Sequence, residues 1–342
     1  MHIVVTLGPP VAFIAQRAKT FVLLPYSFPY KGSGCFTSRT ALRAGDWVQV
    51  RSLSEILATL DSDGKLDSLP FMPEMIRFCG KKFMVAKRAE KTCFDHVQRR
   101  MDNAVHLADL RCDGSAHDGC QSACLLFWRE DWLKRVSDPI DDKSSLSSTS
   151  GAATDSDAEH KLHTRTIVPG RGLTYVCQAT ELEKASKGEL KLWNLDQYYR
   201  EIRAGNVGWP EVKHLLRWSL AWFQWWIFRH TSNKQTTPAS GKQNIVTGDL
   251  VEIRSKKEIF HSLTKTGTHL GLTFSAEMLT FTGKRYRVLG KVDRLIDERT
   301  GRMKVLKNNC LILDSVICRG HCTLCPRAEF LFWRDEWLTR VQ

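Results

Sequence analysis

The fold is decided by Gly45-Asp46-Trp47-Val48-Gln49-Val50-Arg51-Ser52, which recurs as Gly248-Asp249-Leu250-Val251-Glu252-Ile253-Arg254-Ser255. In both stretches apolar and polar side chains alternate with the period of two that is typical of a half-buried β-strand. Each serine then stands three residues before a glutamate, Glu55 or Glu258, which is the spacing of a capping box. We therefore expect a strand followed by a short helix in each copy.

The likeness between the two copies continues to their ends. Glu74-Met75-x-x-Phe78-x-Gly80-Lys81 matches Glu277-Met278-x-x-Phe281-x-Gly283-Lys284 at a constant offset, and both copies close on Phe-Trp-Arg-x-x-Trp-Leu. Because two copies can be compared without other proteins, the repeat shows which residues belong to the unit. The closing peptide predicts a short amphipathic helix with two tryptophans on one face, either closing a small core or stacking on a base or sugar.

These signals predict an α+β protein made of two tandem, small, strand-rich modules with short helices. Asp297-Glu298-Arg299-Thr300-Gly301 predicts a hairpin turn inside the second module. The Gly-Asp-x-Val opening and the run of short strands resemble SH3-like and KOW-like barrels. The repeat pattern also resembles that of uncharacterised bacterial proteins with two such copies, a resemblance that implies no activity.

The chain divides into five segments by composition. We expect an irregular leader over residues 1–43, a first metal-binding repeat over 44–136, and a second over 244–342. Residues 137–160 are rich in serine, aspartate and alanine, which predicts a disordered acidic linker, because such a composition buries no core. Residues 161–243 form a helical middle segment.

The chain is strongly basic, with a net charge of +13 over 342 residues. The linker contributes −5, so the remainder carries +18. A basic balance suits nucleic acid, anionic membranes or phosphorylated partners, although no nucleic-acid-binding motif accompanies it. No convincing secretory signal opens the sequence, so we expect a cytoplasmic protein, with peripheral membrane association as an alternative.

Eleven cysteines in a chain without an export signal indicate metal or redox chemistry rather than disulfides. When the copies are aligned backwards from their shared Phe-Trp, three positions pair: Cys112 with Cys318, His117 with Cys322, and Cys120 with Cys325. Zinc accepts thiolate and imidazole interchangeably, so a histidine that replaces a cysteine is the exchange a zinc site tolerates. The sequence therefore predicts a zinc site in each repeat.

The fourth ligand of each site stays open. In the second copy Cys310 is a candidate, eight residues before Cys318. In the first copy the candidates are Cys93, Cys124 and His106, and Cys177 of the middle segment is a candidate for either site.

An iron–sulfur cluster is the alternative cofactor, because thiolates suit both metals. It would use two all-thiolate sets, Cys93, Cys112, Cys120 and Cys124 in one copy and Cys310, Cys318, Cys322 and Cys325 in the other.

A tryptophan-rich helix is expected over Glu211–His230, with Pro210 in its first turn. Its apolar stretch, Trp218 to Phe228, is shorter than the roughly 20 residues that span a bilayer. Its tryptophans and flanking basic residues suit a helix lying on an anionic membrane surface, and burial between modules is the alternative.

Three functions remain open from the sequence. The first is a zinc-binding scaffold or accessory factor with a protein partner. The second is a zinc or iron–sulfur metalloenzyme or electron-transfer protein of a biosynthetic pathway, and the third is a nucleic-acid-binding protein. No phosphate-binding loop, nucleophile elbow or His-Glu-x-x-His motif is present, so whether the protein is an enzyme stays open.

Overall fold

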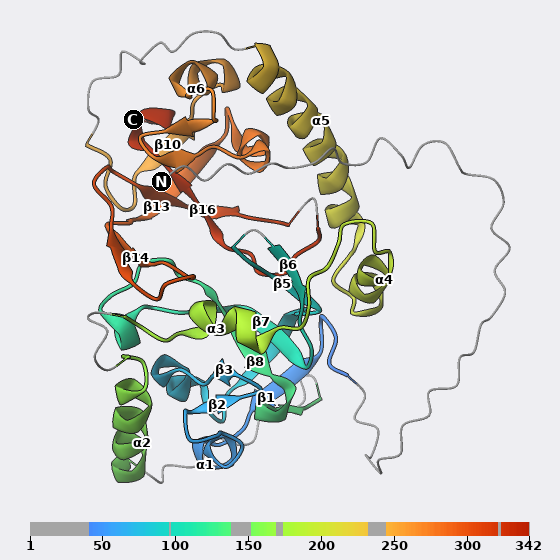
Figure 1. The fold of residues 1–342 in the computed structure, drawn as a ribbon, viewed down its shortest axis with the longest axis vertical. Helices are drawn as coiled ribbons and strands as arrows, with labels where there is room; N and C mark the ends of the chain where they lie inside the picture. Colours follow the sequence, from blue (N-terminus) through green and yellow to red (C-terminus); the bar gives the residue numbers. More distant parts are fainter. Residues whose placement is uncertain are drawn as a thin grey trace, which may run out of the picture. The chain divides into compact units, whose positions relative to one another are not determined.

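The computed structural model describes residues 41–95, 97–137, 152–168, 174–231, 244–320 and 323–341. Except for residues 41–43, the expected leader lies outside the described residues, as does the linker stretch 138–151. The described chain contains two strand-rich modules with short helices, as predicted (Figure 1). We call residues 41–137 module 1 and residues 244–341 module 2.

Module 1 is built on a five-stranded antiparallel sheet in the order β8-β7-β4-β1-β9. Its strands are β1 (Trp47–Val50), β4 (Lys82–Arg88), β7 (Ala104–Arg111), β8 (Leu125–Arg129) and β9 (Leu133–Arg135). The short pair β2 (Lys65–Leu66) and β3 (Leu69–Pro70) and the hairpin β5 (Lys91–Phe94) and β6 (Val97–Arg100) complete it.

Module 2 repeats this plan with a sheet in the order β17-β16-β13-β10-β18. Its strands are β10 (Leu250–Ile253), β13 (Arg285–Lys291), β16 (Leu311–Ile317), β17 (Phe330–Trp333) and β18 (Leu338–Arg340). The pair β11 (Thr268–His269) and β12 (Leu272–Thr273) and the hairpin β14 (Arg294–Ile296) and β15 (Met303–Val305) correspond to the short pair and hairpin of module 1. The predicted turn at residues 297–301 joins β14 to β15 and is confirmed.

Both expected capping boxes are confirmed. Ser52 caps α1 (Leu53–Leu57) and Ser255 caps α6 (Lys256–Ser262), and in each the serine and the glutamate three residues later exchange hydrogen bonds. The exchange satisfies amides that have no partner inside the first turn, so these short helices begin at a fixed residue.

The helix predicted for the closing peptide is wrong. In module 1 the peptide forms β8, the 3₁₀ turn η3 (Glu130–Trp132) and β9, and in module 2 it forms β17, η6 (Asp335–Trp337) and β18. The tryptophans nevertheless close the cores: Trp128, Trp132, Trp333 and Trp337 are fully buried. Phe71 meets Trp132 edge to face with ring centroids 5.3 Å apart, and Phe274 meets Trp337 at the same distance. Pairing within the sheet thus overrides the local helical spacing.

The middle segment is divided between the two modules. α2 (Ala152–Thr164) and α3 (Gln178–Ala185) bury Leu162 and Leu182 in the core of module 1. α2 begins inside the stretch whose composition predicts a linker. α4 (Asp196–Arg203) follows, and the expected tryptophan-rich helix is confirmed as α5 (Trp209–Thr231), which packs on η5 (Ala276–Phe281) of module 2.

The hairpin of each module contacts the cysteine-bearing loop of the other module. Lys91 Nζ on β5 donates a hydrogen bond of 2.5 Å to the Thr323 carbonyl of module 2. Arg294 on β14 in turn donates one of 3.3 Å to the Asp118 carbonyl of module 1, and the Gln121 amide donates to the Arg294 carbonyl at 3.1 Å. The two cysteine loops therefore lie at the contact between the modules.

Candidate metal centre

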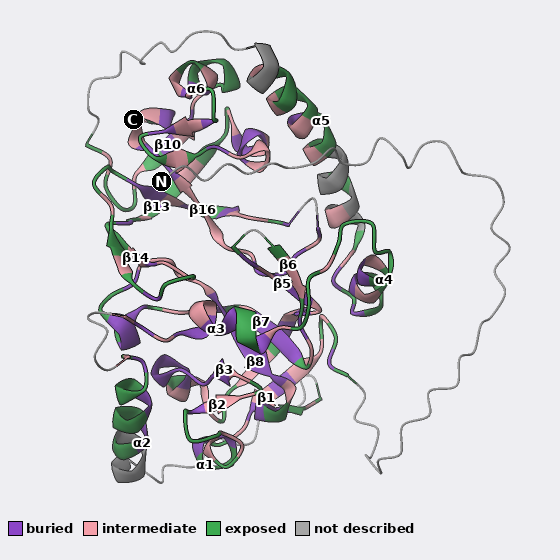
Figure 2. Ribbon diagram, viewed as in Figure 1, coloured by how far each residue is buried: buried purple, intermediate pink, exposed green. Residues whose placement is uncertain are grey.

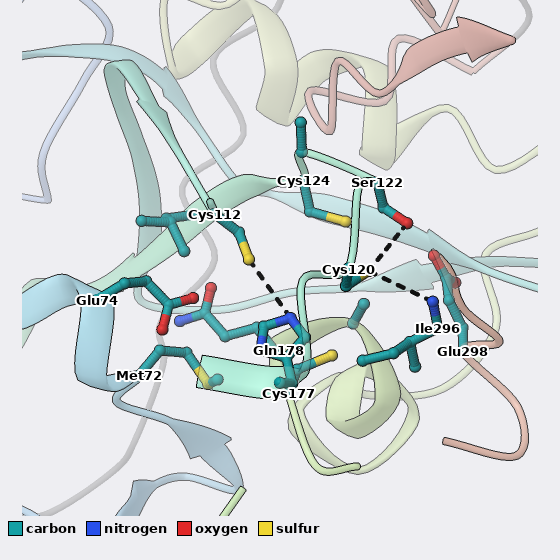
Figure 3. Close-up of a pocket in the computed structure, with 14 residues that line it drawn as sticks. Met72, Glu74, Cys112, Cys120, Ser122, Cys124, Cys177, Gln178, Ile296 and Glu298 are labelled. Carbon is teal, nitrogen blue, oxygen red and sulfur yellow. Dashed lines mark hydrogen bonds between the residues drawn. The ribbon is translucent and has the colours of Figure 1, made fainter. Parts of the chain in front are cut away.

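A small cavity in module 1 gathers most of the sulfur and histidine ligands that the sequence predicts for that copy (Figure 3). Its volume of about 30 Å³ has room for one or two occupants of the size of water. Figure 3 shows the labelled side chains pointing into it from several segments. Its titratable lining residues are Glu74, Cys112, His117, Cys120, Cys124, Cys177 and Glu298.

Three of these side chains converge closely enough to bind one ion. One ligand atom each from Glu74, Cys112 and His117 lie within 4.8 Å of one another. Cys112 Sγ lies 3.6 Å from His117 Nε2. In a tetrahedral zinc site, bonds of about 2.3 Å to sulfur and 2.0 Å to nitrogen place those two atoms about 3.5 Å apart. The spacing of the thiol and the imidazole therefore fits zinc.

The loop that carries these ligands depends on a glycine. Gly114 has a φ of 76°, and a Cβ at this position would lie 2.1 Å from the Cys120 carbonyl oxygen. Because only glycine tolerates both the left-handed backbone and that approach, Gly114 lets the chain fold back between Cys112 and Cys120. Gly320 has the same role in module 2, where a Cβ would lie 2.4 Å from the Cys325 amide nitrogen.

Glu74 enters the cavity from η1 (Pro73–Phe78), a 3₁₀ turn that packs on the cysteine loop. The side chain is buried, and neither carboxylate oxygen has a hydrogen-bond partner within the described part of the chain. Burial raises the pKa of Glu74 above its ordinary value. A buried carboxylate without a hydrogen bond is costly, and a bound cation would compensate that cost.

Burial also tunes the two other ligands. It lowers the pKa of His117 to about 4, so the imidazole is neutral at neutral pH and has a lone pair for a metal. The His117 Nδ1 atom is buried, without a hydrogen-bond partner among the residues described. Burial and the neighbouring Glu74 carboxylate raise the pKa of Cys112 far above its ordinary value, so a metal would have to displace the thiol proton.

Three further cysteines line the same cavity without joining the cluster of three. Cys120 Sγ accepts a 3.3 Å hydrogen bond from the Ile296 amide of module 2 and lies 3.4 Å from Ser122 Oγ. Cys124 is packed near Arg327 and Glu329, and Cys177 precedes α3. Burial raises the pKa of Cys124, and it raises that of Cys177 to about 11. Cys177, proposed from sequence for either site, thus lies at the cavity of module 1.

The ligands predicted for module 2 are arranged differently. Cys318 Sγ donates to Glu277 Oε2 at 3.3 Å, so this pair repeats the neighbourhood of Cys112 and Glu74. Cys325, the counterpart of Cys120, instead lies beside Cys93 of module 1, whose carbonyl accepts a hydrogen bond from Arg327. Cys322 lies outside the described residues.

Three expected ligands are not brought to the sites for which they were predicted. The seven-residue strand β16 separates Cys310 from Cys318 by roughly 26 Å at about 3.3 Å per residue, so no return of the chain joins them. Cys93 lies against module 2 rather than in its own module's cavity. His106 is buried between β4 and β8, with Nδ1 3.0 Å from the Leu126 carbonyl oxygen, and it does not line the cavity.

These positions separate both all-thiolate sets predicted for an iron–sulfur cluster. In the first set, Cys93 lies against the other module, away from the other three cysteines. In the second set, Cys310 lies at the opposite end of β16 from Cys318.

Glu74 is the site residue that the sequence reasoning missed. Its signal was present, because Glu74 and Glu277 are aligned in the shared Glu-Met-x-x-Phe-x-Gly-Lys motif. Both carboxylates face the first cysteine of their loop, so the shared glutamate belongs to the cysteine constellation of each copy.

Compared with models of protein families, with curated proteins and with solved structures, the chain matches none of them.

Proposed function

We propose that the protein is a zinc-binding scaffold or accessory factor, with one zinc ion held in module 1 by Glu74, Cys112 and His117. The observation that carries this proposal is the convergence of a carboxylate, a thiol and a neutral imidazole within 4.8 Å around a water-sized cavity. Zinc is the metal that takes this mixture of ligands in a tetrahedral shell.

We assign Cys120 to the fourth position. It lines the same cavity, and its Sγ already accepts the Ile296 N–H, the kind of outer contact that orients a metal thiolate. A shell closed by four protein ligands is typical of structural zinc. The ion would join β7, the cysteine loop and η1, and so supply stability that a module of this size lacks.

We also propose that each module is a barrel of the SH3-like type. The five-stranded antiparallel sheets, with their short strands and the 3₁₀ turn between the last two, support this assignment.

The test is metal analysis of the full chain with matched variants. We expect zinc in the purified protein, and its loss in Cys112→Ser and His117→Ala. Cys318→Ser serves as the matched control, because it changes the corresponding cysteine of module 2 and should leave the module 1 ion in place. Folded protein without metal, or equal loss in Cys112→Ser and Cys318→Ser, would contradict the proposal.

Substitution with Co²⁺ tests the ligand set. A tetrahedral cobalt site with thiolates gives an intense visible spectrum and a sulfur-to-metal charge-transfer band. We expect Cys120→Ser to weaken that band while cobalt still binds, because one of two thiolates is removed. An unchanged band would exclude Cys120 from the shell.

A second candidate function, binding to an anionic membrane surface, is favoured by one face of α5. On its packed face α5 buries Ala221 in the core of module 2, so the expectation of burial describes this face only. On the opposite face, Leu220 and Phe223 are 66% and 54% exposed, and Lys213 and Arg217 are exposed as well. Figure 2 shows exposed segments alternating with partly buried ones along α5. Apolar and basic side chains on one exposed helical face are typical of helices that lie in a membrane interface.

Within the described residues, no helix combines the length and apolarity that crossing a bilayer requires. Liposome flotation tests the surface binding. We expect the protein to float with vesicles rich in anionic lipid and not with neutral vesicles, and Phe223→Glu to abolish flotation. Absence of flotation with the anionic vesicles would reject this candidate.

A further inference from the structure

The contact between the β5–β6 hairpin of module 1 and the cysteine loop of module 2 surrounds a pair of thiols. Two residues before Cys93, Lys91 holds the Thr323 carbonyl at 2.5 Å. Two residues after Cys325, the Arg327 guanidinium donates to the Cys93 carbonyl. These contacts fix the hairpin to the loop on both sides of Cys93 and Cys325.

Cys93 and Cys325 lie between these anchors. The Cys325 thiol lowers the pKa of Cys93, so the two thiols are neighbours, and both are free. Cys325 is buried, whereas Cys93 is half-buried and retains contact with solvent. A small reagent can therefore reach Cys93 first, with Cys325 adjacent behind it.

The Arg327 guanidinium favours reaction at Cys93. Its Nη1 lies 3.9 Å from Cys93 Sγ. The hydrogen bond from Cys325 and the positive charge of Arg327 both lower the pKa of Cys93. A thiol of lowered pKa that is beside a cation, partly exposed and next to a second thiol is the usual setting of an oxidation-sensitive cysteine.

We propose that Cys93 and Cys325 are a modification site, a dithiol that a hydroperoxide oxidises to a disulfide between the two modules. The Cys93 thiolate attacks one peroxide oxygen, which breaks the O–O bond and gives a sulfenic acid and, after protonation, water or an alcohol. The Cys325 sulfur then attacks the Cys93 sulfur, releases the sulfenic oxygen as a second water, and loses its proton. Two thiols are oxidised by two electrons, and one peroxide is reduced.

At the equivalent contact on the other side of the module boundary, the hairpin residue that meets the loop cysteine is not a cysteine. There Cys120, the counterpart of Cys325, meets Ile296 on β14, with the Ile296 amide 3.3 Å from the sulfur. Equivalent hairpins contact equivalent loops, but only the contact of Cys93 with Cys325 brings a hairpin cysteine to a loop cysteine. The site is separate from the proposed zinc ligands Glu74, Cys112, His117 and Cys120, so the two proposals are independent.

The experiment treats the full chain with hydrogen peroxide, blocks the remaining thiols and maps the peptides by mass spectrometry. We expect a linkage between the peptides of Cys93 and Cys325, two hydrogens lighter than the free pair and reversed by dithiothreitol. Cys93→Ser should abolish it, and Cys124→Ser, which changes a half-buried cysteine at the module 1 cavity, should retain it. A linkage of Cys325 to another cysteine would overturn the proposal, as would two unreacted thiols in folded protein.

Two additional experiments test whether the pair can form a disulfide and whether it binds metal instead. In protein treated with a chelator, so that Cys120 is free of metal, Ile296→Cys places a thiol at the equivalent contact and should add a second linkage, to Cys120. If that variant links while Cys93 and Cys325 do not, the pair is inert and the proposal fails. Oxidation is also compared with and without added Zn²⁺. If zinc protects Cys93 and a chelator removes the protection, the two sulfurs belong to a metal site and the disulfide assignment is wrong.

Discussion

The cysteine loops of the two modules share a backbone plan but hold their sulfurs in different surroundings. Both loops turn at a glycine that a side chain would block, and both place their first cysteine against a glutamate. In module 1 the next ligand, His117, closes on the same cavity. In module 2 the last cysteine pairs with Cys93 of the other module. Duplication therefore preserved the loop, while contacts between the modules decided which sulfurs meet.

If the two modules are equivalent apart from these sites, matching substitutions in their cores should lower the free energy of unfolding equally. Trp128→Ala and Trp333→Ala each remove a fully buried ring, and we expect each to lower the free energy of unfolding by about 3–5 kcal/mol. Urea denaturation followed by circular dichroism measures both. Trp193, which is 75% exposed, is the control, and Trp193→Ala should change stability by less than about 1 kcal/mol. A large cost at only one of the buried tryptophans would show that the cores differ.

The contact between the modules should give the protein a pH dependence centred on Glu201. This residue is buried beside Lys91, and burial raises its pKa to about 7 from 4.5. The folded protein thus retains a proton that the unfolded chain releases above its own pKa. The stability from Glu201 is therefore full below about pH 4.5 and is lost as the pH rises through about 7, by about 3 kcal/mol at 1.36 kcal/mol per pKa unit.

The measurement compares unfolding of the wild type and Glu201→Gln between pH 4.5 and 8. The amide has no charge to bury, so we expect the variant to lack this decline and to become the more stable protein at the upper end. Parallel curves for the two proteins would mean that Glu201 does not titrate in this range.

Substitutions of the two shared glutamates should differ in their effect on zinc binding, because only Glu74 is a proposed zinc ligand. Glu74→Gln removes a proposed zinc ligand and should weaken zinc binding by about 10–100-fold, in the range seen when contacts at a metal site are lost. Glu277→Gln makes the same change in module 2, where the carboxylate accepts from the Cys318 thiol and the Arg319 amide. Competition with a chelating dye measures both. Equal weakening by the two substitutions would mean that the zinc ligands are not confined to module 1.

Substitution of the helix-capping serines should have the smallest effect on stability, and this effect should be nearly the same in the two modules. Ser52→Ala and Ser255→Ala each remove one half of a capping box, and we expect each to cost about 1 kcal/mol. Thermal unfolding of the two variants measures this. Glycine at the same positions, Ser52→Gly and Ser255→Gly, should cost only a few tenths of a kcal/mol, because an exposed glycine leaves the amides open to water. If the stability costs of Ser52→Ala and Ser255→Ala differ by more than about 1 kcal/mol, the two helix starts have different local folds.

Much of the candidate site was predictable from sequence, but not the way its members are grouped. Comparing the copies identified Cys112, His117 and Cys120, because exchange of histidine for cysteine is visible in a repeat. It passed over Glu74, since a shared glutamate in a helical motif also suits a solvated surface. It also assigned Cys93 and Cys310 by their distance along the chain, which carries no information once hairpins and strands separate sequence neighbours.

The sequence by itself determined the local structure of this protein: the alternating strands, the capped helices, the glycine turns and the duplication. Each depends on residues within a few positions of one another, so each is readable in either copy. Only the tertiary structure decided that the closing peptide forms strands, and that the hairpin of each module reaches the cysteine loop of the other. These outcomes depend on hydrogen bonds and burial between residues far apart in the chain, such as Cys93 and Cys325, and no local pattern encodes such pairs.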